Sequence, residues 1–187
     1  TARLTRYRET QERLAALLDA IPGQRVLCAG LGTGNELTRL RSLEPSLRLA
    51  GVDLSMAALV RARRKPCGDT SPASLALMDV QSLAFRDACF DRVLCYHVLD
   101  FVDDPSRTVS ELLRVLAPGG RFVISFPSGS ESAGFGAGLG VVQRDGVAVD
   151  LDVVILAGGQ AADVGTAGTL VDHRIAGLQA MARIQRD

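Results

Sequence analysis

The segment VLCAGLGTG, residues 26–34, places three glycines at alternate positions directly after a short apolar run. A short apolar run that ends in glycines is typical of a buried strand, and leucines at helical spacing follow it over 35–43. Glycine adopts the positive φ angles of a tight turn and lets the backbone come close to a ligand. This segment therefore predicts a strand, a glycine turn and a helix, and the rest of the fold must be built around that unit.

The same alternation of strand and helix patterns continues along the chain. Strands that alternate with helices need crossover connections, which give a mostly parallel sheet covered on both faces. We therefore predict an α/β fold with a doubly wound, mostly parallel sheet flanked by helices, and an antiparallel strand near the C-terminus. Residues 118–120, Pro-Gly-Gly, are expected to form a turn, and residues 129–140 a glycine-rich loop. The expected strands cover 25–29, 47–53, 74–78, 92–96 and 121–126, with one or two more in 147–157, and the expected helices cover 3–20, 35–43, 56–65, 106–116 and 172–186.

The length and composition of the chain favour a single folded domain. The chain has 187 residues, of which 47% are hydrophobic and 22% are charged, as is ordinary for a globular protein. We expect one domain over 1–187, with an N-terminal helix in 1–22 and a ligand-binding core in 23–128. A loop, late strands and a closing helix are expected in 129–187.

Charge and hydropathy argue against several classes of partner. The formal net charge is zero, so a strongly basic surface for nucleic acid is not expected. No apolar stretch reaches the ~20 residues that span a bilayer, and the first residues, TARLTRYRETQERL, are too charged for a signal peptide. The four cysteines form no CxxC pair, which argues against zinc and against a disulfide framework. We expect a cytoplasmic protein without a metal site and without a nucleic-acid or membrane partner, and we keep a homodimer open.

The spacing of the glycines distinguishes between two kinds of ligand. A dinucleotide fingerprint has the spacing G-x-G-x-x-G and presents its backbone to a pyrophosphate. Here Gly30, Gly32 and Gly34 have the spacing G-x-G-x-G, Asn35 stands where that fingerprint has its last glycine, and no Gly-Lys-Ser/Thr occurs. The pattern favours a ligand with a nucleoside end and a small uncharged linker. A tight turn that binds no ligand is the alternative.

Two carboxylates end the next two expected strands. Asp53 and Asp79 are expected at the carboxyl edge of the sheet, where doubly wound sheets bind their ligands. An ionised carboxylate accepts two hydrogen bonds, so ribose hydroxyls are natural partners for Asp53. Asp79 can accept a hydrogen bond from an adenine amino group while the Val80 amide donates to a ring nitrogen. The alternative for Asp53 is a cap on the helix that begins near Ser55.

Four segments carry a likeness to a known family: VLCAGLGTG, GVDLSMAALVRAR, MDVQSLAFRDACFDRVLCYHVLDFVDD and ELLRVLAPGGRFVISFPS. In one collinear order over about residues 20–128, they resemble the class I S-adenosylmethionine-dependent methyltransferases, particularly the small-molecule group. The resemblance implies a Rossmann-like sheet that binds S-adenosyl-L-methionine as cofactor. The residues implied in binding are Gly30, Gly32 and Gly34 beside the methionine portion, Asp53 and the adjoining Leu54 at the ribose, Asp79 and Val80 at the adenine, and the backbone of Cys95 at the methionine amino group.

Tyr96 and His97 follow the fourth expected strand, where the resemblance implies that a methyl acceptor meets the cofactor. The implied reaction is methyl transfer to an oxygen, nitrogen or carbon atom of a small metabolite. A histidine can take a proton near neutral pH, so His97 is the candidate base, with Tyr96 beside it in the predicted catalytic set. A histidine packed beneath the next helix with one hydrogen bond is the alternative.

Cys28 is a departure from the family pattern. The resembling proteins commonly carry an acidic residue two places before the first glycine, and this chain has a small, normally neutral thiol there. An electrostatic partner for the ammonium group of the cofactor is therefore missing at this position. The alternative function is a catalytically inactive, methyltransferase-like binding or scaffold domain.

Overall fold

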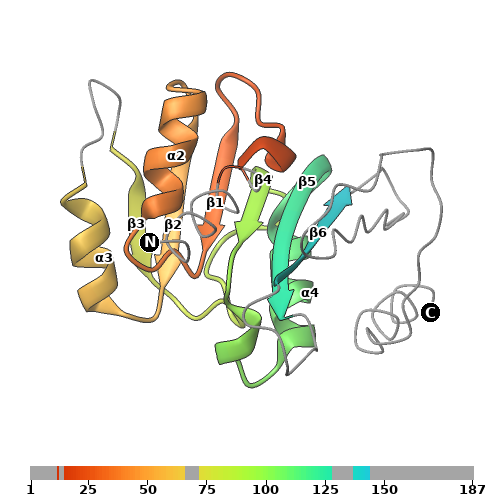
Figure 1. Cartoon of the computed structure of the whole chain (residues 1–187). Helices are drawn as coiled ribbons and strands as arrows, with labels where there is room; N and C mark the ends of the chain where they lie inside the picture. Colours follow the sequence, from red (N-terminus) through yellow and green to blue (C-terminus); the bar gives the residue numbers. More distant parts are fainter. Residues whose placement is uncertain (1–11, 13–14, 66–71, 128–136, 144–187) are drawn as a thin grey trace.

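The computed structural model describes residues 12, 15–65, 72–127 and 137–143, which include one six-stranded sheet with helices on both faces (Figure 1). No helix in these ranges is long and apolar enough to cross a membrane. The strands are β1 Arg25–Ala29, β2 Arg48–Asp53, β3 Ser74–Leu77, β4 Phe90–Cys95, β5 Leu116–Pro127 and β6 Ala137–Gln143. The helices are α2 Asn35–Leu43, α3 Met56–Arg63, the short 3-10 helix η1 Leu99–Phe101 and α4 Pro105–Val115, and residues 15–18 are also helical.

The sheet has the strand order β3-β2-β1-β4-β5-β6. Strands β1 to β5 are parallel, and β6 is antiparallel to β5. The chain builds outward from β1 to β3 and then returns to place β4 on the other side of β1. Doubly wound sheets bind ligands at such a reversal, outside the carboxyl ends of the strands. The predicted fold class is confirmed, and the edge at which β1 to β5 end is called the carboxyl edge below.

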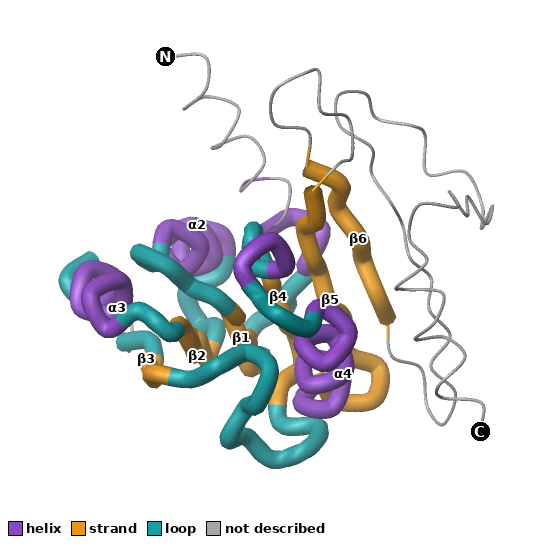
Figure 2. Tube along the Cα trace, turned by 90° about the horizontal axis from the view of Figure 1, so that it is seen from below, coloured by secondary structure: helices purple, strands orange, loops and turns teal. Residues whose placement is uncertain are grey.

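Alternate residues of the central strands enter two separate hydrophobic layers. In β1, Val26 and Cys28 belong to the layer that packs against α2 and α3, whereas Leu27 and Ala29 belong to the layer that packs against α4. Figure 2 shows these helices on opposite sides of the sheet. Burial on both faces explains why the strands are continuous apolar runs in the sequence, without the alternation of a sheet that faces water on one side.

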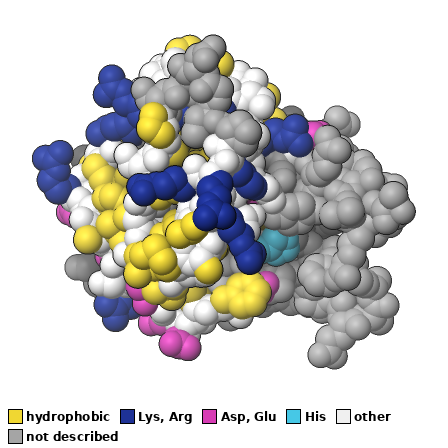
Figure 3. Space-filling view, turned by 90° about the vertical axis from the view of Figure 1, so that its left-hand side faces the viewer, with side chains coloured by type: hydrophobic (Ala, Val, Ile, Leu, Met, Phe, Trp, Pro, Cys, Tyr) yellow, Lys and Arg dark blue, Asp and Glu magenta, His cyan; other side chains and the backbone are white. Residues whose placement is uncertain are grey.

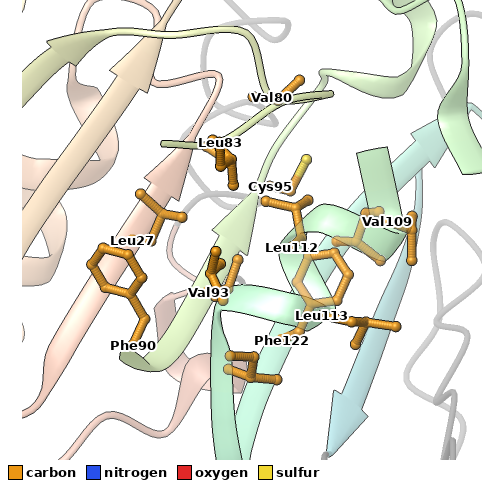
Figure 4. Packing of buried hydrophobic residues seen from close by; sticks show 14 of the residues in the cluster. Leu27, Val80, Leu83, Phe90, Val93, Cys95, Val109, Leu112, Leu113 and Phe122 are labelled. Atoms are coloured by element: carbon orange, nitrogen blue, oxygen red, sulfur yellow. The ribbon is translucent and has the colours of Figure 1, made fainter. Parts of the chain in front are cut away.

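A loop, and not a helix, connects β3 to β4. Residues 78–89 cross the face that carries α4, and Leu83 packs into the same layer (Figure 4). Phe85 is partly buried against this layer. A loop that packs on a sheet face must find partners for its backbone groups outside a strand ladder. Helix α4 provides them, because Arg114 donates to the carbonyls of Leu83 and Phe85 at 2.8 and 2.9 Å. The Leu83 N–H in turn donates to the Glu111 carboxylate at 2.8 Å.

The start of β5 differs from the sequence prediction. Strand β5 begins at Leu116, so residues 118–120, expected as a turn, lie within the irregular start of the strand. The pairing register shifts between Phe90 and Arg92 of β4 at this point. Gly119 has a φ of +73°, so the backbone bends here while the strand assignment continues.

Strand β6 is a second difference, because its first half lies in the segment that the sequence predicted as a loop. Gly138 and Gly140 pair with Phe126 and Ile124 of β5. Pairing to an existing strand overrides the low strand propensity of glycine here. The expected late strands in 147–157, the closing helix in 172–186 and most of the helix in 3–20 lie outside the described residues, so the single-domain boundaries of 1–187 stay a prediction.

We expect Arg114→Met to lower the free energy of unfolding by about 2–4 kcal/mol, because two loop carbonyls and Glu111 lose their charged donor. The Arg114 guanidinium holds the pKa of Glu111 below 4.5, the ordinary value for a glutamate. The stabilisation by this pair is therefore fully present above pH 4.5 and is lost as the pH falls through the lowered pKa. Urea unfolding at pH 7 and in acid measures both effects.

Asp87→Asn is the matched control for Arg114→Met. Asp87 also accepts a hydrogen bond from Arg114, at 2.7 Å, but its side chain is 77% exposed. An exposed pair of this kind contributes less than about 1 kcal/mol. Equal losses for the two substitutions would contradict the view that Arg114 acts through the carbonyls of Leu83 and Phe85.

Candidate functional site

Glycines and polar residues meet at the carboxyl edge. The glycine turn of residues 30–34 follows β1, Asp53 ends β2, Asp79 lies just beyond β3 and His97 lies just beyond β4. Because parallel strands end at one edge, the structure brings together these segments, which the sequence predicted separately. No group of three His, Cys, Asp or Glu residues in the described ranges could hold a metal ion.

The three glycines of the turn are required for different reasons. Gly30, Gly32 and Gly34 have φ angles of +66°, +56° and +79°, in the left-handed region that favours glycine. A Cβ on Gly30 would lie 2.2 Å from Cγ2 of Val98, and a Cβ on Gly34 would lie 2.8 Å from Cβ of Ala62. A Cβ on Gly32 would meet nothing within 4 Å among the described atoms. Packing therefore fixes Gly30 and Gly34, whereas the bare backbone of Gly32 borders open space.

Asp53 ties the glycine turn to the next strand end. Its Oδ2 accepts the N–H of Gly32 at 2.7 Å, and its Oδ1 accepts the N–H of Ser55 at 2.7 Å. A carboxylate offers about four acceptor positions, so both oxygens keep a lone pair for a ligand. Ser55, and not Asp53, caps α3, because the Ser55 hydroxyl accepts the N–H of Ala58 at 3.2 Å. Asp53 thus holds the turn and can still accept hydrogen bonds from hydroxyls.

The end of β3 combines a carboxylate with exposed apolar side chains. Asp79 accepts the N–H of Gln81 at 2.8 Å, and the Val80 side chain is buried, so only its backbone is available to a ligand. The side chains of Leu54 and Leu77 are 67% and 51% exposed. Figure 3, a view onto the α3 and β3 side of the molecule, shows hydrophobic side chains gathered there. Apolar surface beside a few placed polar groups suits a flat ring with polar edges, such as a nucleobase.

His97 has an unusual backbone conformation beyond the end of β4. Its φ is +53°, which is uncommon for a residue with a Cβ. The His97 N–H donates to Oγ of Ser125, a buried residue of β5, at 2.8 Å. Ser125 could not be found from the sequence, because a serine inside an apolar strand carries no motif. Ser125 helps to hold His97 in this conformation.

The surroundings of the His97 ring favour its neutral form. Burial lowers the pKa of His97, and the nearby carboxylate of Asp100 acts in the opposite direction. The ring lies 4.1 Å from that of Tyr96, centroid to centroid. A neutral imidazole at neutral pH is able to accept a proton.

Three other side chains discussed from the sequence lie in the core. Tyr96 and Cys28 belong to the layer against α2 and α3, and Cys95 belongs to the layer against α4. Burial raises the pKa of both thiols, that of Cys95 to about 12, and the carboxylate of Glu36 raises the pKa of Cys28 further. Cys28 is thus a neutral core residue, and the side chain of Cys95 is buried, so the cofactor contact predicted for the Cys95 backbone stays a prediction.

Comparisons with known proteins agree on one family. A family model described as a methyltransferase domain matches residues 27–124, from β1 to β5. The phosphatidylethanolamine N-methyltransferase of Cereibacter sphaeroides is 37% identical over 116 residues, which are 61% of this chain and 55% of that protein. The ubiquinone/menaquinone biosynthesis C-methyltransferase of Geobacter sulfurreducens is 35% identical over 105 residues, which are 54% of this chain and 41% of that protein. The chain spans about half the length of these curated relatives.

A solved structure supports the same comparison. The S-adenosylmethionine dependent methyltransferase from Mesorhizobium loti has a TM-score of 0.54 and 28% sequence identity to this chain. The alignment covers 62% of this chain and 52% of that one. The family match contains all four strand ends of the candidate site, since it begins in β1 and ends in β5.

We expect Gly30→Ala to lower the free energy of unfolding by about 2–5 kcal/mol, because the positive φ and the overlap with Val98 add together. Gly23→Ala is the control, since Gly23 has a φ of +80° and no atom within 4 Å of an added Cβ. The control should lose about 1–2 kcal/mol from the backbone alone. Chemical denaturation of both variants measures the difference, and equal losses would show that Val98 does not constrain the turn.

We expect an NMR titration of the His97 ring to give a pKa below 6.5, the ordinary histidine value, because burial penalises the imidazolium. Asp100→Asn should lower that pKa further, since it removes the charge that favours the protonated ring. In linkage terms, the unfolded chain binds the proton first, so the free energy of unfolding decreases as the pH falls below 6.5 toward the folded pKa. A pKa at or above 6.5 in the unmodified chain would contradict this description of the His97 site.

Proposed function

The chain belongs to the methyltransferase domain family, and from this premise we propose that it binds S-adenosylmethionine at the carboxyl edge and transfers its methyl group to a small-molecule acceptor. The observation that carries the proposal is the turn at Gly32. Asp53 fixes the N–H of Gly32, while the Cα of Gly32 borders open space. A rigid turn with bare backbone at this point allows a ligand to lie directly against the chain.

The methionine end of the cofactor fits the glycine turn. Gly34 is the N-cap of α2, which begins at Asn35, and no side chain caps this helix end. The backbone N–H groups of a helix N-terminus and the positive end of its dipole favour a carboxylate such as that of methionine. Residues 30–34 therefore suit this part of the ligand.

The adenosine end fits the next two strand ends. The lone pairs that Asp53 keeps can accept hydrogen bonds from both ribose hydroxyls. Leu54 and Leu77, both more than half exposed, provide apolar surface for the adenine ring. Asp79 can accept a hydrogen bond from the adenine amino group, and the Val80 backbone lies next to it. We therefore propose that the residues predicted at the ribose and the adenine bind these parts of the cofactor.

The acceptor side is assigned to His97. S-adenosylmethionine supplies a methyl group that is already activated on a sulfonium, so the protein has mainly to align the nucleophile and to take a proton from it where it carries one. The lowered pKa keeps the His97 imidazole neutral near pH 7. The hydrogen bond from the His97 backbone N–H to Ser125 fixes the backbone. We propose His97 as the base. Tyr96 is buried, so its predicted catalytic part is limited to contact with the His97 ring.

The identity of the acceptor follows only coarsely from the relatives. One relative is named for methylation of a nitrogen and the other for methylation of a carbon. We propose a small metabolite with a nitrogen, oxygen or carbon nucleophile. A cytoplasmic location and a homodimer remain predictions from the sequence.

A second candidate function is a methyltransferase-like binding domain without turnover. Cys28 favours it, because the buried neutral thiol provides no charge for the ammonium group of the cofactor. A domain without turnover can still bind the cofactor, so binding alone does not separate the two candidates. Methyl transfer from radiolabelled S-adenosylmethionine to any compound in a metabolite extract would reject the inactive domain.

We expect isothermal titration to detect S-adenosylhomocysteine binding to the unmodified chain and at least about tenfold weaker binding to Gly32→Ala, because the added Cβ occupies the space of the ligand. Gly23→Ala is the matched control. Gly23 has a similar positive φ and the same open surroundings, but it precedes β1 at the opposite end of that strand. Gly32→Ala and Gly23→Ala should therefore lose similar stability, and only Gly32→Ala should lose affinity.

Gly32→Ala is a sharper test than removal of the Asp53 carboxylate. Asp53 holds the N–H groups of Gly32 and Ser55, so its loss changes the turn as well as any ribose contact. No heat of binding with the unmodified chain at millimolar S-adenosylhomocysteine would overturn the proposed function. Equal affinity of the Gly32→Ala variant would show that the ligand lies elsewhere.

A further inference from the structure

Gln81 forms several hydrogen bonds at the carboxyl edge, although no sequence motif gave it a role. Its backbone N–H donates to Oδ1 of Asp79 at 2.8 Å, and its side-chain Nε2 lies 3.4 and 3.5 Å from the two Asp79 oxygens. On its other side, the carboxamide Oε1 accepts the backbone N–H of Asp104 at 2.9 Å. The Gln81 carbonyl accepts Nε of Arg107 at 2.8 Å. Gln81 therefore contacts both the third strand end and the N-terminus of α4.

The two sides that Gln81 connects are separated in the sequence. Asp104 is the N-cap of α4, and its side chain accepts the N–H of Arg107 at 2.9 Å. The segment that leads into this cap contains His97 and η1. The carboxamide suits the position because it donates to a carboxylate with one atom and accepts from an amide with the other.

We propose that Gln81 is a positioning residue that holds Asp79 and the start of α4 in one arrangement, so that cofactor bound at Asp79 orders the segment behind His97. This inference rests on the proposed function, because it assigns the adenine of the cofactor to Asp79. Coupling of this kind needs a contiguous set of hydrogen bonds, and the set here runs from Asp79 through Gln81 to Asp104. When bound adenosine fixes Asp79, it also fixes Gln81 and therefore the hydrogen bond that the Asp104 N–H donates to Gln81.

Two substitutions separate the two connections. Gln81→Met keeps the length of the side chain and removes both the donor and the acceptor. Gln81→Glu keeps an oxygen for the Asp104 N–H and keeps the backbone N–H that donates to Asp79. It removes only the side-chain donor to Asp79 and places a negative charge beside that carboxylate. Ser82→Ala is the matched control, because Ser82 is the next residue along the loop and is exposed.

The experiment measures binding of S-adenosylhomocysteine and of adenosine by calorimetry, together with hydrogen exchange of the peptide that contains Asp104. We expect both Gln81 variants to bind both probes about three- to tenfold more weakly, the effect of one hydrogen bond, and Ser82→Ala to bind them unchanged. S-adenosylhomocysteine should slow exchange at Asp104 in the unmodified chain and in Gln81→Glu. In Gln81→Met this slowing should be lost, a result that a change in stability alone does not produce.

The outcomes distinguish this inference from the function on which it rests. An unmodified chain that binds neither probe overturns the proposed function and the inference together. A chain that binds both probes, with unchanged affinity in folded Gln81→Met or with the same slowing at Asp104, overturns the inference alone. If Gln81→Met does not fold, unchanged probe affinity in Gln81→Glu overturns it equally.

Discussion

The structure depends on how the sheet face that carries α4 is covered between β3 and β4. A loop lies there in place of a helix, and the backbone groups of a loop that packs on a sheet face need partners that no ladder supplies. Helix α4 supplies them from side chains spaced three or four residues apart on one helix face. The residues that do so are Arg107, Glu111 and Arg114. Because the same loop carries Asp79 to the carboxyl edge, the hydrogen bonds that stabilise the fold also set the position of a candidate ligand contact.

The glycine turn, on the other side of the site, is also held in place by neighbouring elements. Val98, just beyond β4, fills the place of a side chain at Gly30, and Ala62 of α3 fills the place of one at Gly34. The turn is therefore packed against two neighbouring elements, with its one open position at Gly32. The Asp53 carboxylate then fixes that open position from the end of β2. Rigid support on three sides gives a bare backbone surface that needs no reorganisation to meet a ligand.

Much of this arrangement could be predicted from the sequence, because burial on both faces leaves short apolar runs separated by glycine and polar turns. The family match confirms the resemblance found from the motifs, and the structure confirms the doubly wound order. The contacts of Gln81 and Ser125 could not be predicted. Gln81 bonds to a residue 23 positions away and Ser125 to one 28 positions away, and neither contact has a local pattern. Strand β6 was predicted in part as a loop, because its glycines outweighed a pairing partner that the local sequence does not reveal.

The structure changes the interpretation of Cys28. From the sequence, the missing acid at this position led to the alternative of a catalytically inactive, methyltransferase-like binding or scaffold domain. In the structure the thiol is only 2% exposed and packs in an apolar layer, where burial keeps it neutral. The shape of the turn comes from the bond between Asp53 and Gly32 and from the packing of Gly30, and the Cys28 side chain takes part in neither. Absence of the acid therefore removes a charge and leaves the geometry of the glycine turn in place.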